Sequence, residues 1–528
     1  MRAGPDNPER LGHRTRCPAE EAEAGSGGGR EPQVHGACRW LGRVPRRPVL
    51  PEDPEAGTGT ATPGAAVPLL PGKAEGGSDP NKGKAEDIAE RIAGAVRDAA
   101  EVDGRYASVL RKLKTTAGLK VDEKTLADAA QDTQAVQKAA GKYADDAKIP
   151  KDKSPEENAE WWKGLSQEKR DEYATLYPAS IGALDGLPSA VRDDANRMVF
   201  AETRAKYQLE LDSIPAEPSP KLVSHGARGD MVYSQEWLDW KHEYSGQKER
   251  LQNSMNGMNA IQARFDRTGT NGLPEAYLLG FSPDANKDGR VILATGNPDT
   301  ADHTAVYVPG TFSDLATIGG EDGDKTHGDL GRSETLWAQS NRLAPGQNVS
   351  TITWFDYNAP DSIAPQATRG VYAEEGGPTL HQFMGGLEAA QGGADKSHTT
   401  VIGHSYGSTV VGVATQSGSW RDGPMADDIL VAGSPGMQVD RAADLGVHPD
   451  HVWAMGAPYS DDFRHGGRFM GLGDNGTIPT DESFGGNIMK NDSAGHTGFW
   501  DEKDGKASLG LKNQARVITG RHGDVVLE

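Results

Sequence analysis

The stretch that decides the fold is Thr399–Ala414, which reads TTVIGHSYGSTVVGVA. It opens with four β-branched residues, Thr399–Ile402, a short run that is typical of a strand buried on both faces. From Ser408 onward the residues are mostly small or apolar and indicate a helix. The segment GHSYG between them predicts a sharp strand-to-helix turn. Such a turn requires Gly403 and Gly407, because a Cβ at either position would collide with the neighbouring strand or helix.

Ser405 lies at the centre of this turn, in a G-x-S-x-G pattern. With 67 glycines in 528 residues the pattern is weak by itself, and an incidental serine in a glycine-rich turn is the alternative interpretation. Its position between a strand and a helix makes the pattern specific, because the turn directs the serine Oγ above the sheet. The turn also places the Tyr406 amide at a helix N-terminus, where an unpaired donor stabilises an oxyanion. We therefore predict that Ser405 is a nucleophile and that Tyr406 supplies an oxyanion donor.

A serine hydroxyl at neutral pH needs a histidine that is oriented by a carboxylate. A strand-to-helix turn that carries a nucleophile is called a nucleophile elbow. In proteins with such an elbow, the acid follows the serine along the chain and the histidine follows the acid. The acid is expected just after the second strand beyond the elbow, Val452–Met455, and the next acids are Asp461 and Asp462. Asp461 is favoured because it lies closer to the end of the strand, and Asp462 stays open as the alternative.

Three histidines follow these acids: His465, His496 and His522. His465 comes very soon after Asp461, so the chain between them is short for both side chains to reach the same site. His522 lies in the last residues of the sequence, where chains tend to fray. His496 lies in a Gly-His-Thr-Gly loop before the last predicted helix, and we favour it as the general base.

A second oxyanion donor is expected from the loop after the strand-like run Ala305–Val308. This loop continues as Pro309-Gly310-Thr311. Gly310 permits a close approach of the backbone, and the Thr311 amide can then face the site. Thr311 and Tyr406 are therefore the predicted oxyanion hole.

Strand-like and helix-like runs alternate throughout residues 274–528. The strand-like runs span 305–308, 351–355, 399–402, 429–432 and 452–455, after a predicted hairpin at 276–281 and 291–294. Short apolar strands that alternate with helices predict an α/β fold whose mostly parallel sheet is covered by helices.

Two further regions precede this predicted catalytic domain. Residues 84–265 show helical periods and contain no catalytic constellation. Residues 1–80 are rich in Gly, Pro, Arg, Glu and Ala without any period, and we predict a disordered tail. Because all predicted catalytic residues lie after Pro274, a chain that begins near Ile261 is expected to fold and to hydrolyse a small ester by itself. The alternative is that the helical region packs onto the catalytic domain through Trp161, Trp162, Trp237 and Trp240.

The composition argues against several classes of partner and cofactor. The formal net charge of −21 argues against nucleic acid, which needs a basic surface. No run of 18 apolar residues occurs, so no transmembrane helix is expected. Cys17 and Cys38, the two cysteines, lie in the predicted tail, and no metal or cofactor is expected in the catalytic region. The first residues lack the apolar core of a signal peptide, so a cytoplasmic location is expected, with non-classical export as the alternative.

Four stretches resemble an actinobacterial family of α/β-hydrolases of unknown function, whose elbow reads GHSYGS. These stretches are Tyr307–Thr311, Ile402–Ser408, Val431–Gly436 and Gly495–Gly498. The resemblance covers about 274–528 and implies an α/β-hydrolase fold with hydrolase chemistry but no defined substrate. Upstream, Trp161-Trp162 and Leu184–Pro188 look like the helical segment that often precedes such domains. That segment often looks like the helical hairpins of type VII secretion substrates, a pattern from which residues 1–80 depart.

The leading functional hypothesis is a serine hydrolase that cleaves a small acyl ester through Ser405, Asp461 and His496, with an acyl-enzyme intermediate. A thioesterase or an amidase on the same triad is the first alternative, because the sequence does not distinguish the leaving groups. The second alternative is a non-catalytic interaction protein or secretion-associated protein with a relic hydrolase domain. Because Ser405, Asp461 and His496 are all present, a hydrolase domain that has lost its activity is disfavoured. The sequence makes no prediction of the oligomeric state.

Overall fold

A computed structural model describes residues 123–141, 144–225, 230–285, 288–320, 328–418, 423–456, 471–473, 476–503 and 505–528. The predicted tail, 1–80, lies outside these ranges, as do residues 84–122 of the predicted helical region. The candidate acids Asp461 and Asp462 and the alternative base His465 also lie outside them.

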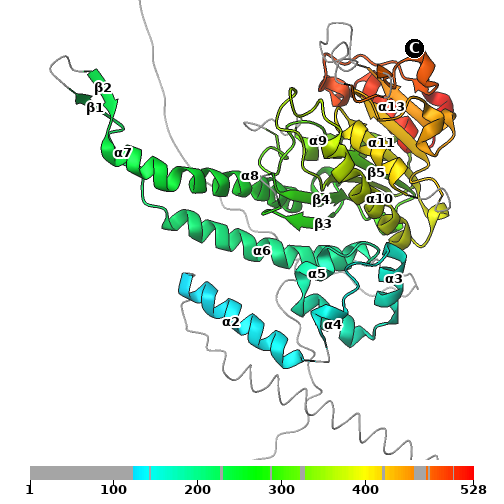
Figure 1. Cartoon of the computed structure of the whole chain (residues 1–528). Coiled ribbons are helices and arrows are strands. Elements are labelled where there is room, and N and C mark those ends of the chain that lie inside the picture. Colours follow the sequence, from blue (N-terminus) through cyan, green and yellow to red (C-terminus); the bar gives the residue numbers. More distant parts are fainter. Residues whose placement is uncertain are drawn as a thin grey trace, which may run out of the picture. The chain divides into compact units, whose positions relative to one another are not determined.

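An eight-stranded sheet forms the centre of the C-terminal region (Figure 1). In spatial order its strands are β10 (Asn487–Ile488), β9 (Val452–Met455), β8 (Asp428–Ala432), β7 (His398–His404), β5 (His303–Val308), β6 (Val349–Phe355), β4 (Arg290–Thr295) and β3 (Ala276–Ser282). The pairs from β10 to β6 are parallel, whereas β4 pairs antiparallel with both β6 and β3. The predicted mostly parallel sheet is confirmed, and each predicted parallel run lies within an observed strand.

Helices cover both faces of this sheet. They are α9 (Asp329–Leu343) and α13 (Leu509–Ile518) on one face, and α10 (Val371–Gln391) and α11 (Gly407–Ser417) on the other. Successive residues of a strand point to opposite faces. In β8, Ile429 and Val431 belong to the buried cluster that includes α10 and α11. Leu430 and Ala432 belong to the cluster that includes α9 and α13, so the strand is apolar throughout.

The region before the sheet is helical, as predicted. Its described helices are α2 (Glu123–Ala140), α3 (Pro155–Gly164), α4 (Gln167–Leu176), α5 (Pro178–Gly182), α6 (Ser189–Ser213), α7 (Gln235–Trp240) and α8 (Gly246–Asp266). A capping box opens α3: the Glu157 amide donates to Ser154 Oγ at 3.3 Å, and the Ser154 amide donates to the Glu157 carboxylate at 3.1 Å. A small hairpin, β1 (Leu222–His225) and β2 (Asp230–Tyr233), lies between α6 and α7. In the described part of the chain, no helix is long and apolar enough to cross a membrane.

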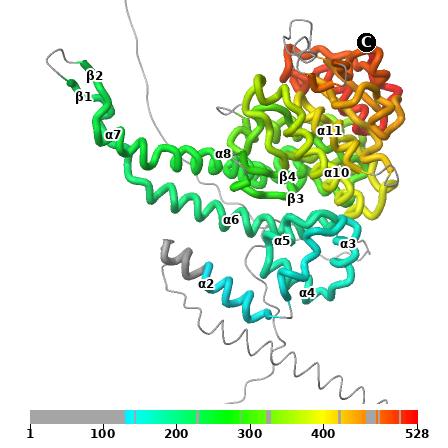
Figure 2. Tube along the Cα trace, in the orientation of Figure 1, coloured from blue at the N-terminus to red at the C-terminus, as the bar shows by residue number. Residues whose placement is uncertain are grey.

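The long helices α6 and α8 run alongside each other and lead to the sheet (Figure 2). Phe200 and Tyr207 of α6 and Met258 and Ile261 of α8 belong to the same buried cluster as the sheet residues. A chain that begins near Ile261 would lose most of these side chains. The packing therefore argues against the expectation that such a chain folds by itself.

Side chains of α6 bind the free edge of β3, the last strand of the sheet. The Asp193 carboxylate accepts from the Leu278 amide at 2.6 Å, and Asn196 donates to the Leu278 carbonyl at 2.9 Å. Arg197 donates to the Ala276 carbonyl at 2.7 Å. A free strand edge presents unpaired backbone groups with which another chain can pair. The helix α6 therefore protects the sheet at this edge.

Candidate active site

Ser405 lies between β7 and α11, at the carboxyl edge of the parallel strands. Its φ of +51° is left-handed, a conformation that costs a non-glycine residue about 1–2 kcal/mol. The Ser405 amide donates to the Ala432 carbonyl at the end of β8, at 2.9 Å, which helps to hold the turn. A strained serine on a strand-to-helix turn is the geometry of a nucleophile elbow.

The glycines around Ser405 leave no room for a side chain. A Cβ on Gly403 would lie 2.5 Å from a Cα of α11, and one on Gly407 would lie 2.2 Å from the Val308 carbonyl oxygen. A Cβ on Gly310 would lie 2.7 Å from the Cβ of Ser405 itself. Contacts this short with the backbone or with a Cβ require the backbone to move. Glycine at these positions therefore lets the elbow and the loop after β5 approach each other.

His496 faces Ser405, and its Nε2 lies 2.9 Å from the Ser405 Oγ. The histidine belongs to the loop that precedes the final helix, and a large part of its side chain is buried. Gly433, which follows β8, lies against its ring, since a Cβ there would be 2.8 Å from the His496 Cε1. The structure thus brings the favoured serine and the favoured histidine, 91 residues apart, within hydrogen-bonding distance.

A second histidine, His404, holds the backbone of the loop that carries His496. The His404 Nε2 lies 3.0 Å from the His496 carbonyl oxygen. Because a carbonyl only accepts, this nitrogen carries the proton and donates. Burial, and after it the positive charge of Arg332, hold the pKa of His404 well below its ordinary value, so the ring is neutral. Sequence reasoning missed this contact, since a position within the elbow gives no signal of a partner so far along the chain.

The other candidate residues are not all tested by the structure. Asp461, Asp462 and His465 lie outside the described residues, so the choice of acid stays a prediction. His522 contacts Asp428 at the start of β8, with 2.9 Å between its Nε2 and the carboxylate. Ser405 lies beyond the end of β7, and β7 and β8 are parallel. His522 therefore lies at the amino ends of these strands, whereas Ser405 lies at their carboxyl ends.

A cavity of about 600 Å³ opens beside Ser405 and His496. Thr311 and Tyr406 both line it. Among the described residues, neither of their amides donates a hydrogen bond to a backbone oxygen. The Tyr406 phenol donates to the Arg369 carbonyl. The two amides are therefore available to an oxyanion in this cavity.

The cavity combines an apolar wall with one ion pair. The apolar wall includes Phe312, Ile363 and Pro435. Arg332 and Asp329 also line the cavity, and their side chains pair at 2.9 Å. The Arg332 guanidinium lies 5.2 Å from the centre of the Trp500 ring, which fixes it further. The ion pair of Asp329 and Arg332 thus forms the charged part of the cavity wall.

Residues 284–466 match the family model described as "Alpha/beta hydrolase", a stretch that includes β5 to β9 and the elbow. The "Uncharacterized protein Rv2079" of Mycobacterium tuberculosis is 29% identical over 292 residues, which cover 54% of this chain and 40% of that protein. The "Uncharacterized protein Mb0988c" of Mycobacterium bovis is 32% identical over 176 residues, which cover 33% of this chain and 63% of that protein. The matched part of the chain thus spans less than half the length of the first of these relatives.

Solved structures are also similar to this chain. The hyperthermophilic esterase from the archaeon Pyrobaculum calidifontis is 11% identical with a TM-score of 0.31, over 52% of this chain and 91% of that one. A chain described as "Structure of arylesterase" is 9% identical with a TM-score of 0.29, over 55% of this chain and 98% of that one.

Proposed function

We propose that the protein is a serine hydrolase that cleaves an ester-type acyl bond. The observation that carries this proposal is the 2.9 Å contact between the His496 Nε2 and the Ser405 Oγ, beside a cavity of about 600 Å³. The match of residues 284–466 to an α/β-hydrolase family model supports the same class of enzyme.

In the acylation step, the Ser405 Oγ attacks the carbonyl carbon of the ester while the His496 Nε2 accepts the serine proton. The electron pair of the carbonyl moves to its oxygen, and the amides of Thr311 and Tyr406 stabilise the resulting oxyanion. The bond to the leaving oxygen then breaks, and His496 donates the proton to it. An alcohol departs, and the acyl group stays on Ser405.

In the deacylation step, a water molecule attacks the acyl-enzyme and gives its proton to His496. The bond between the acyl carbon and the Ser405 Oγ breaks, the proton returns to the serine, and a carboxylic acid is released. We assign the orientation of His496 to Asp461, which follows β9 along the chain. His404 acts as a positioning residue, because it binds the His496 backbone rather than the reacting atoms.

Hydrolysis of a short-chain nitrophenyl ester by the full chain tests this proposal. Replacement of Ser405 by Ala should lower kcat on the order of 10³-fold or more while the chain stays folded. Asp461→Asn and Asp462→Asn form a matched pair, of which only the first should cause a large loss, on the order of 10⁴-fold. Undiminished turnover by the Ser405→Ala variant would refute the assignment of the nucleophile.

A further inference from the structure

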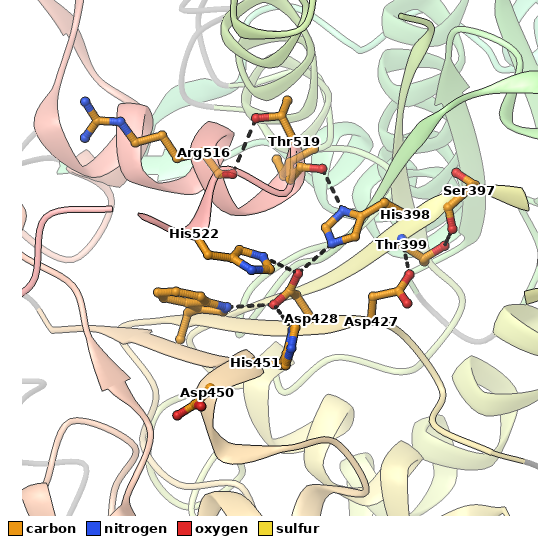
Figure 3. Close-up of polar contacts among 12 residues, drawn as sticks. Ser397, His398, Thr399, Asp427, Asp428, Asp450, His451, Arg516, Thr519 and His522 are labelled. Carbon is orange, nitrogen blue, oxygen red and sulfur yellow. Dashed lines mark hydrogen bonds and ion pairs between the residues drawn. The ribbon is translucent and has the colours of Figure 1, made fainter. Parts of the chain in front are cut away.

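A cluster of imidazoles surrounds one buried carboxylate (Figure 3). It lies at the amino ends of the parallel strands, whereas Ser405 lies at their carboxyl ends. Asp428, at the start of β8, is fully buried. Its Oδ2 lies 2.8 Å from the His398 Nε2 and 2.9 Å from the His522 Nε2. Its Oδ1 lies 3.0 Å from the His451 Nδ1 and 2.8 Å from the Trp453 indole nitrogen. Three other segments of the chain therefore meet on a single carboxylate.

The contacts of His398 fix which of its nitrogens carries a proton. The His398 Nδ1 lies 3.0 Å from the Ile518 carbonyl oxygen, which only accepts, so this nitrogen donates. In a neutral imidazole the Nε2 is then a bare lone pair, yet it points at an Asp428 oxygen 2.8 Å away. Two lone pairs at this distance repel each other. A cation between them removes the repulsion, and that cation is either a proton or a metal ion.

We propose that His398, Asp428 and His522 bind a divalent transition-metal ion of the zinc class. Their three ligand atoms lie within 4.8 Å of one another. Zinc bonds of about 2.0–2.1 Å place tetrahedral ligand atoms roughly 3.3 Å apart, so binding requires only small shifts of the side chains. Imidazole and carboxylate ligands suit zinc better than calcium or magnesium. From the sequence, no metal is expected in the catalytic region, and the members of this cluster are single residues far apart in the chain that form no recognisable motif.

The surroundings of the three residues agree with a metal site. A metal-bound histidine usually donates its other ring nitrogen to a carbonyl or carboxylate, which is what His398 does toward Ile518. The Trp453 indole holds the second oxygen of Asp428 and fixes the orientation of the carboxylate. A groove of about 420 Å³, lined by His398, His451 and His522, gives an ion access from solvent. The fourth position is left to His451 or to water.

The place of the site in the fold indicates a structural role. The strand β7 starts at His398 and ends just before Ser405, so its 7 residues separate the site from the serine by roughly 20 Å. His522 follows α13, whereas His398 and Asp428 belong to the sheet. An ion here would join the last segment of the chain to the sheet. We therefore expect it to change the thermal stability and to leave the catalytic step unchanged.

Titration of the chelator-treated full chain with Zn²⁺, followed by calorimetry and by thermal melting, tests the proposal. We expect one Zn²⁺ per chain and a higher Tm with the ion bound. His522→Gln removes a ligand and should weaken binding at least 10-fold. His448→Gln is the matched control, because His448 lines the same groove but its side chain is 70% exposed and its partner is Asp450. The control should bind Zn²⁺ as the unchanged protein does.

Cobalt provides a second readout that needs no variant. Co²⁺ bound by the unchanged chain should show the intense visible bands of tetrahedral coordination. If Zn²⁺ does not bind, or binds equally to the His522→Gln variant, the metal site is refuted and the cation is a proton on His398. The pale spectrum of hydrated Co²⁺ in the presence of the folded protein would refute it as well. Because neither readout uses enzymatic activity, the result is independent of the proposed hydrolase function.

Discussion

His404 donates a hydrogen bond to the backbone carbonyl of His496, at 3.0 Å, while the His496 ring faces Ser405 at 2.9 Å. The residue immediately before the proposed nucleophile thus holds the backbone of the proposed base. Since His404 ends the central strand β7, the position of the base relative to the serine is set by the sheet.

Replacement of His404 should therefore affect catalysis through the position of His496. We expect His404→Phe, which lacks the donor, to lower kcat by about 10-fold to 100-fold with little change in KM. His404→Gln keeps a donor near the same place and should retain most of the activity. Steady-state kinetics of both variants check this expectation. Equal losses in the two variants, or losses confined to KM, would show that the hydrogen bond has no positioning role.

The same histidine predicts how stability depends on pH. Burial and the nearby Arg332 hold the pKa of His404 in the folded protein well below the ordinary value of 6.5. Below that pH the unfolded chain binds a proton that the folded chain does not bind, so acidification favours unfolding. The free energy of unfolding should fall by up to about 1.4 kcal/mol per pH unit from this residue. Urea titrations at several pH values should show a shallower fall for His404→Gln, and identical slopes would contradict the prediction.

The conformation of Ser405 predicts an order of stability for two inactive variants. Its φ of +51° is strained for alanine but not for glycine. Glycine also makes the unfolded chain more flexible, which offsets part of this gain. Ser405→Gly should therefore be more stable than Ser405→Ala by about 0.5–1 kcal/mol in urea unfolding. A more stable alanine variant would show that the elbow carries no such strain.

The elbow and the sheet could be predicted because their signals are local. The strand, the turn and the helix around Ser405 follow one another within Thr399–Ala414, and each follows from its own residues. The expected order of serine, acid and histidine along the chain then favoured His496, which the structure brings next to Ser405. The contact of His404 with the His496 carbonyl depends on how a distant loop folds back, and no local pattern encodes this.

The contacts of α6 with the edge strand and the cluster around Asp428 could not be predicted for the same reason. His398 and Asp428 become neighbours through the pairing of parallel strands, and His522 joins them only after α13 has packed. Likewise, the polar residues Asp193 and Asn196 look like solvated helix positions in the sequence. Only the position of β3 beside α6 shows that they bind a strand edge.

The contact of Asn196 with the edge strand predicts a loss of stability. The Asn196 side chain is buried and donates to the Leu278 carbonyl at 2.9 Å. Asn196→Ala would leave this carbonyl without its donor, and we expect a loss of about 1–3 kcal/mol in the free energy of unfolding. Asn253→Ala, at an exposed position of α8, is the control and should change stability by less than about 0.5 kcal/mol. Equal effects of the two changes in urea unfolding would show that α6 does not support the sheet edge.

Covalent labelling by a fluorophosphonate, mapped by mass spectrometry of the digested full chain, tests the central claim most directly. The reagent phosphonylates an activated serine, so the account predicts one label, on Ser405. His496→Gln should slow the labelling strongly, because the general base is lost. A folded chain that takes up no label, or an equal label in the Ser405→Ala variant, would contradict the account.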